Sequence, residues 1–219
     1  MMTMDFQMNA TSKEEVRVVT AGDILDDLMP VRFNIVSVDY DALTDRMSYY
    51  LATCSLTSLQ RRDKWPSKID VFGVAQNLLT SLEHGPTVAH TYYCHKNKLT
   101  SLRHGPTSVC YFDCSENLIA SLDGAPRVIE ESFICNFNML TSLKGIHEQV
   151  DYVYRFSAEN NPITSHVLGL MLIDGLKTVT LDNKKVEEIL NSYLGKGRVG
   201  MLMAQEELIE AGLDEYAQL

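Results

Sequence analysis

The feature that most constrains this chain is a short block that recurs six times. The block reads Leu-Thr-Ser-Leu or a close variant, and successive copies begin 23, 20, 20, 21 and 23 residues apart, at Leu56, Leu79, Leu99, Ile119, Leu140 and Ile163. An asparagine stands two residues before each of the last five copies, at Asn77, Asn97, Asn117, Asn138 and Asn161, and Cys54 holds that place before the first. Self-similarity at such a period predicts structural repeats that stack into one continuous core.

Each block follows a pair of mostly apolar residues that are separated by a single residue, such as Phe112 and Cys114. Residues two apart on a β-strand point to the same face, so both members of the pair are expected to enter the core. The chain then bends, and a buried asparagine can donate and accept hydrogen bonds to backbone groups that the bend leaves unpaired. The repeat therefore predicts parallel strands with one asparagine per turn, stacked as a ladder.

The unit apolar-x-apolar-x-x-Asn-x-Leu resembles the second half of the leucine-rich repeat, including its exchange of Asn for Cys at Cys54. The resemblance covers residues 49–165, slightly over half of the chain. It implies an α/β solenoid: a short leucine-rich-repeat horseshoe with a parallel β-sheet on its concave face. Unrelated strands of a β-sandwich would not keep asparagine in phase through five units.

The sequence divides into an N-terminal cap (1–47), a solenoid of six units (48–165) and a C-terminal cap (166–219). Residues 1–47 hold 4 basic and 9 acidic residues, residues 166–219 hold 5 and 9, and the middle holds 10 and 11. Polar caps at both ends of a solenoid are expected on structural grounds alone. In the N-terminal cap we expect residues 1–12 to be mobile, a short helix over 22–28 and a strand over 31–38.

In the C-terminal cap, Val179 and Leu181 continue the phase of the repeat, which predicts a degenerate seventh rung. The apolar stretch 166–176 before it predicts a helix on the convex side. Asp182 or Asn183 can cap a helix over 184–194, and a second helix is expected over about 199–211. The end of the chain, with Gly-Lys-Gly-Arg-Val-Gly at 195–200, resembles the C-terminal tail of repeat proteins encoded by tailed bacteriophages, where LTSLxxGP-type units also occur.

Charge, hydropathy and cysteine content exclude several classes of function. The net charge of −10 leaves no basic face for nucleic acid, and the longest apolar run, 167–173, is too short to span a membrane. No secretion signal is readable at the N-terminus, so we expect a cytoplasmic protein whose five cysteines stay reduced. If the chain is phage-encoded, that compartment is the cytoplasm of the host.

The motifs that could carry chemistry each have a structural explanation. The segment 195–200 matches G-x-G-x-x-G, but a helix is expected before it, so its glycines are better explained as a helix end and a turn, although Lys196 and Arg198 could hold an anion. Cys94, Cys114 and Cys135 share one core position, which disfavours a zinc site. Cys110 is the remaining candidate nucleophile. We predict no catalytic residue, no metal and no cofactor, and we interpret His84 and His104 as solvated turn residues.

The residues between and beside the core pairs are expected to line the outer face of the sheet. Six of them form the predicted partner-binding surface: Tyr50, Tyr93, His95, Tyr111, Asp113 and Arg155. Tyrosine and arginine are favoured contact residues, although tyrosines also pack across strands for stability alone. We therefore predict a non-enzymatic module that binds a host or phage protein through the concave sheet and modulates or inhibits it. The alternatives are a structural component of a virion or other assembly and, less favoured, an enzyme. The sequence leaves the oligomeric state open.

Overall fold

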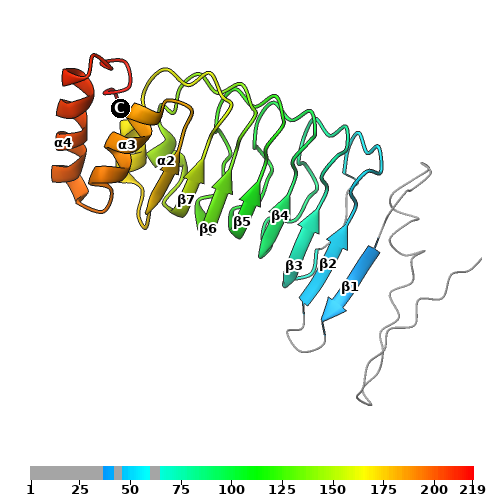
Figure 1. Ribbon diagram of the computed structural model, residues 1–219. Coiled ribbons are helices and arrows are strands. Elements are labelled where there is room, and N and C mark those ends of the chain that lie inside the picture. Colours follow the sequence, from blue (N-terminus) through cyan, green and yellow to red (C-terminus); the bar gives the residue numbers. More distant parts are fainter. Residues whose placement is uncertain (1–36, 42–45, 60–64) are drawn as a thin grey trace, which may run out of the picture.

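The computed structural model describes residues 37–41, 46–59 and 65–219, and within them the chain forms one eight-stranded sheet. The strands lie in sequence order: β1 (Ser37–Asp41), β2 (Arg46–Tyr50), β3 (Ile69–Gly73), β4 (Thr91–Tyr93), β5 (Ser108–Asp113), β6 (Val128–Ile134), β7 (Tyr152–Ser157) and β8 (Thr178–Thr180). β1 is antiparallel to β2, and every later pair is parallel. The chain thus winds into a solenoid of about six turns (Figure 1), which confirms the predicted repeat architecture.

One row of large side chains crosses the whole interior of the sheet. Its members stand opposite one another on β2 to β8 and are exposed by 4% or less: Tyr49, Phe72, Tyr92, Phe112, Phe133, Phe156 and Val179. The ring centroids of consecutive aromatics from Phe72 to Phe156 lie 4.9 to 5.7 Å apart. The second core position, which includes Cys94, Cys114 and Cys135, is equally buried. Both members of the repeated pair therefore enter the core, as the spacing predicts.

The predicted asparagine ladder is present, and Asn117 shows its geometry. Its Oδ1 accepts a hydrogen bond from the backbone N–H of Leu99 (3.0 Å), and its Nδ2 donates to the carbonyls of Cys94 (3.1 Å) and Cys114 (2.9 Å). The same bonds recur at the other four positions, Asn77, Asn97, Asn138 and Asn161. Each amide therefore joins two successive turns and satisfies backbone groups that have no strand partner at the bend.

The ladder ends at the seventh rung, where Lys184 occupies the asparagine position. Its Nζ donates to the carbonyl of Leu181 (2.9 Å), the bond that the amide makes in earlier rungs. Beyond it, the Asn191 side chain bonds both the N–H and the C=O of Val179, and the Glu187 carboxylate accepts from the N–H of Leu181. Side chains of the following helix thus satisfy backbone groups at the outer edge of β8. At the position of the predicted seventh rung, β8 pairs in parallel with β7, with Val179 opposite Phe156.

Two helices pack against each other after β8: α3 (Lys184–Tyr193) and α4 (Gly197–Glu210). Asn183 caps α3 by accepting a hydrogen bond from the N–H of Val186 (3.2 Å), which settles the choice between Asp182 and Asn183. Asp182 instead accepts from the backbone N–H groups of Asn160 and Asn161. α4 begins two residues before the predicted start.

The prediction of a helix over 166–176 is wrong. The structure has only a five-residue 3-10 helix, η1 (Leu168–Leu172), and the short helix α2 (Ile146–Gln149) lies in the preceding turn. The backbone is extended again at Ile173, and the N–H of Asp174 donates to the carbonyl of Asp151 in the turn below. Because this hydrogen bond returns the backbone to the parallel stack at Asp174, the helix cannot extend to residue 176.

Of the strand expected over 31–38, residues 37 and 38 belong to β1, which continues to Asp41, and residues 31–36 lie outside the described residues. The expected mobile stretch 1–12 and the helix 22–28 lie outside the described residues.

Candidate functional site

The outer sheet face, formed by side chains that point away from the core of β2 to β8, carries two rows of residues in register. The first row contains Tyr50, Gly73, Tyr93, Asp113, Ile134, Ser157 and Thr180. The second contains Val71, Thr91, Tyr111, Ser132, Arg155 and Thr178. Five of the six residues predicted for the surface lie in these rows, and the sixth, His95, lies two residues after the end of β4.

Four of the predicted residues touch one another and are termed the central cluster: Tyr93, His95, Tyr111 and Asp113. The rings of Tyr93 and Tyr111 lie 5.6 Å apart on adjacent strands, and the His95 ring is 5.9 Å from that of Tyr93. His95 Nδ1 is 3.3 Å from the Asp113 carboxylate. All four side chains are half-buried, so each is held in place by its neighbours and still presents surface to solvent.

The Asp113 carboxylate is the electrostatic centre of this cluster. Its burial alone would raise its pKa, but the close approach of the His95 imidazole and the hydrogen bonds from Ser115 outweigh burial, and the pKa is lowered. The backbone N–H of Ser115 donates to Asp113 Oδ1 at 2.9 Å. Burial and the nearby Asp113 charge raise the pKa of Tyr111, which keeps its hydroxyl protonated. The cluster therefore presents two phenols, an imidazole and one fixed negative charge.

The other two predicted residues flank the cluster without contributing to it. Tyr50 is separated from Tyr93 by Gly73, which places no side chain between the two tyrosines. Arg155 stands two strands beyond Tyr111, and its guanidinium lies 5.4 Å from the Tyr154 ring centroid. The structure thus brings together four of the six predicted residues.

Sequence reasoning missed a second polar group near the start of the strands. Arg46 pairs with Asp70 at 3.1 Å, and His90 lies 4.0 Å from the same carboxylate. Cys110 and Glu131 hold the equivalent place in the next two units, two residues before the core aromatic, where strict alternation would turn them inward. Register shifts between β2 and β3, and between β6 and both of its neighbours, place an extra residue in β3 and in β6 and interrupt that alternation there. Polar residues at an inward phase in three of four successive units, at Asp70, His90 and Glu131, were the available signal.

The residues considered for chemistry occupy structural positions. Burial raises the pKa of the Cys94, Cys114 and Cys135 thiols, and burial together with Glu131 and Glu130 raises that of Cys110. Protonated thiols are weak nucleophiles. In the part of the chain that the structure describes, no three His, Cys, Asp or Glu side chains are grouped as metal ligands. Gly195 and Gly197 have φ of 77° and 58° and join α3 to α4, and the exposed His84 and His104 lie at turns with positive φ.

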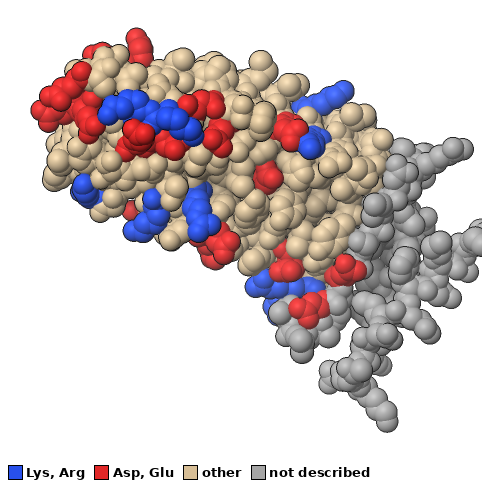
Figure 2. All heavy atoms as spheres, in the orientation of Figure 1, with Lys and Arg blue, Asp and Glu red and all other residues tan. Residues whose placement is uncertain are grey.

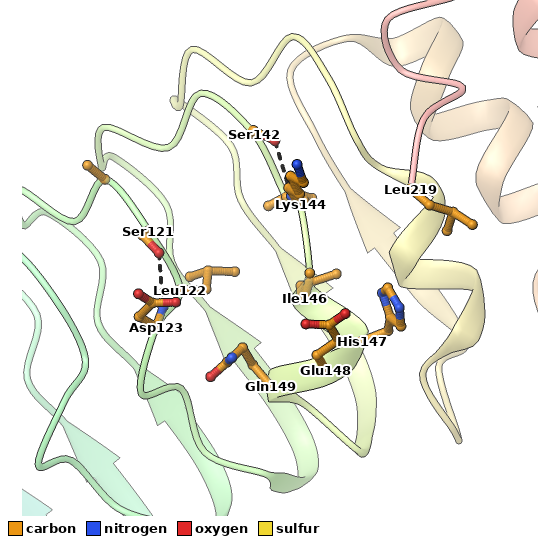
Figure 3. Close-up of a pocket in the computed structure, with 13 residues that line it drawn as sticks. Ser121, Leu122, Asp123, Ser142, Lys144, Ile146, His147, Glu148, Gln149 and Leu219 are labelled. Carbon is orange, nitrogen blue, oxygen red and sulfur yellow. Dashed lines mark hydrogen bonds between the residues drawn. The ribbon is translucent and has the colours of Figure 1, made fainter.

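A hollow of about 520 Å³ lies among the turns, where α2 interrupts the regular repeat (Figure 3). It is lined by residues of two successive turns, by α2 and by Leu219. Ser121 Oγ and Ser142 Oγ accept hydrogen bonds from the backbone N–H groups of Asp123 and Lys144, which hold the two turns in the same shape. The lining mixes both charge signs, and no repeat motif or residue spacing predicts a site here.

The charged side chains are unevenly spread over the molecule. Figure 2 shows acidic residues, with basic side chains among them, gathered over the end that carries α3 and α4, whereas the middle of the visible face is largely uncharged. No helix among the described residues is long and apolar enough to cross a membrane. The chain matches no protein-family model and no curated protein sequence.

Proposed function

We propose that this chain is a non-enzymatic, leucine-rich-repeat-type module that binds a partner protein through its outer sheet face. In this proposal the face is the concave side of a short horseshoe, and the segments before and after the repeats cap its ends. The agreement between the L-x-L-x-x-N-type sequence unit and the asparagine ladder supports the leucine-rich-repeat assignment. The observation that carries the binding proposal is the central cluster, with its ring contacts and its held carboxylate.

The physical properties of the cluster suit protein recognition. Tyrosine offers a large contact area with a polar tip and loses little rotamer entropy on binding. Because the strands and the ladder fix the backbone beneath it, little ordering remains to be done when a partner binds. A lysine or arginine of the partner could lie over the Tyr93 or Tyr111 ring and face the Asp113 carboxylate. A basic loop or strand is therefore the expected counterpart.

The resemblance to repeat proteins of tailed bacteriophages makes a host or phage protein in the host cytoplasm the expected partner. Binding would modulate or inhibit that protein by covering its surface. The module itself supplies no reaction in this proposal.

The test is affinity capture from host lysate with the intact chain and with the double variant Tyr93→Ala, Tyr111→Ala. We expect the variant to lose the captured partner while its melting temperature stays close to that of the wild type, because both rings are half-exposed. The matched control is Phe137→Ala, Met139→Ala, which removes two exposed apolar side chains from a bend outside the sheet face. Equal capture by the wild type and the tyrosine variant would contradict the proposal.

A further inference from the structure

Helix α4 is apolar on two sides, although only one side packs against the protein. Gly200, Ala204 and Leu208 are buried, and the helix contacts α3 and η1. The opposite side is exposed and carries Val199 (66% exposed), Leu202 (57%), Met203 (43%) and Ile209 (49%). Solvent-facing positions of a surface helix are normally polar, so this second apolar side needs an explanation.

The exposed apolar residues form one continuous stripe. Positions 199, 202, 203, 206 and 209 follow the i, i+3, i+4, i+7 spacing that places residues on one side of a helix. Glu206 is the charged member of that set and lies near the middle of the stripe. Any partner that covers the stripe must therefore supply a positive charge to Glu206, since a buried carboxylate without a partner is costly.

A second copy of α4 can supply this positive charge. Its first turn carries Arg198, two residues after Lys196, and its second half carries Glu206, Glu207 and Glu210, of which Glu207 is already paired with Lys185 in the same chain. When two copies of such a helix lie antiparallel, the basic start of each faces the acidic end of the other, and their macrodipoles are also opposed. A patch that complements itself in this way is what a two-fold interface requires.

From this geometry we infer that the chain associates with a second copy of itself through the outer side of α4, as an antiparallel two-fold pair. A two-fold axis beside Leu202 sets the two Leu202 side chains against each other. It also brings Arg198 of each copy level with Glu206 of the other, four residues from the axis on either side. The inference rests on α4 alone and is independent of the function proposed for the sheet face.

A lipid surface fits this helix less well than a second copy does. Glu206 and Glu210 on the exposed side, together with a net charge of −10, would be repelled by anionic headgroups. The 14-residue helix is about 21 Å long, so the contact falls at the small end of specific interfaces. We therefore expect a dimer that dissociates in the micromolar range.

Sedimentation equilibrium of the full chain, from low micromolar to several hundred micromolar concentration, tests the inference. The wild type is expected to shift from 24.7 kDa towards twice that mass as concentration rises. Leu202→Glu should remain a monomer throughout and should melt like the wild type at low concentration, because residue 202 is exposed in the single chain. Leu118→Glu, at an equally exposed site in the repeats (48%), is the matched control and should dimerise normally.

Charge exchange tests the antiparallel arrangement. Arg198→Glu places like charges level with each other and should weaken association at least tenfold, and Arg198→Glu combined with Glu206→Arg should restore it. A monomeric wild type at all concentrations would overturn the inference, as would a dimer that Leu202→Glu leaves intact or a double exchange that fails to restore pairing. A monomer that instead binds phosphatidylglycerol vesicles or a different protein through Leu202 would assign this side to that partner and likewise overturn it.

Discussion

The inner and outer sides of the same strands follow different rules in this protein. Inside, six successive units place an aromatic ring in one row, and five place an asparagine in the ladder. Outside, the residue that directly follows each core aromatic varies from unit to unit: Tyr50, Gly73, Tyr93, Asp113, Ile134 and Ser157. Inner residues are restricted to rings that stack against the ring in the next unit. Outer residues can differ from one unit to the next, which leaves them available for recognition.

Adjacent residues of β5 give the largest expected contrast between the two sides. Phe112 is fully buried, so Phe112→Ala should lower the free energy of unfolding by about 4 kcal/mol through lost burial and a residual cavity. Tyr111 is half-exposed, and Tyr111→Ala should cost about 1 kcal/mol. Urea denaturation of both variants measures the difference. Comparable losses would show that the outer side is also structural.

The ladder gives the next largest effect. Asn117→Leu leaves the buried N–H of Leu99 without a partner and removes one of the two asparagine bonds from each of the Cys94 and Cys114 carbonyls, which should cost about 2 kcal/mol. Its control is Asn136→Ala, an asparagine on the outer side that accepts hydrogen bonds from Ser157 Oγ and the N–H of Glu159. That variant should cost about 1 kcal/mol. The ladder would lose its assigned role if the two variants unfolded at the same urea concentration.

The smallest expected effect concerns the charge of Asp113. Because its pKa is lowered in the folded chain, the stability it contributes is present above its ordinary value of 3.8 and is lost as pH falls through the folded value. Melting temperatures measured from neutral pH down to pH 3 should therefore fall more for the wild type than for Asp113→Asn. The free-energy difference between the two profiles should stay under about 1 kcal/mol. Parallel profiles would mean that His95 and Ser115 do not hold the carboxylate.

The repeat made the inside of this fold predictable. Asn77 and its counterparts recur because each bend presents the same unpaired backbone groups, so a period in the sequence becomes a period in space. The same phase extended correctly to Val179 in a unit that has lost its asparagine. Lys184 donates to the Leu181 carbonyl in place of the missing amide, and no sequence pattern predicts this hydrogen bond.

The outer side was predictable only in outline. Alternation placed Tyr93, Tyr111 and Asp113 on one face, but the contact of His95 with Asp113 depends on how the chain bends after β4. The group around Asp70 was missed because strand irregularities break the alternation on which the prediction depends. The prediction of a helix over 166–176 was wrong for a related reason. It relied on the local apolar content, whereas the helix is ended by the backbone hydrogen bond from Asp174 to Asp151 in the preceding turn.

Hydrogen exchange of asparagine side-chain amides in solution, followed by NMR, tests the central claim most directly. If the turns are stacked by a buried ladder, the NH₂ groups of Asn77, Asn97, Asn117, Asn138 and Asn161 exchange far more slowly than that of Asn160, which is exposed and directly precedes the last of them. Exchange of all six at the rate of an exposed amide would contradict the stacked arrangement and, with it, the surface built upon it.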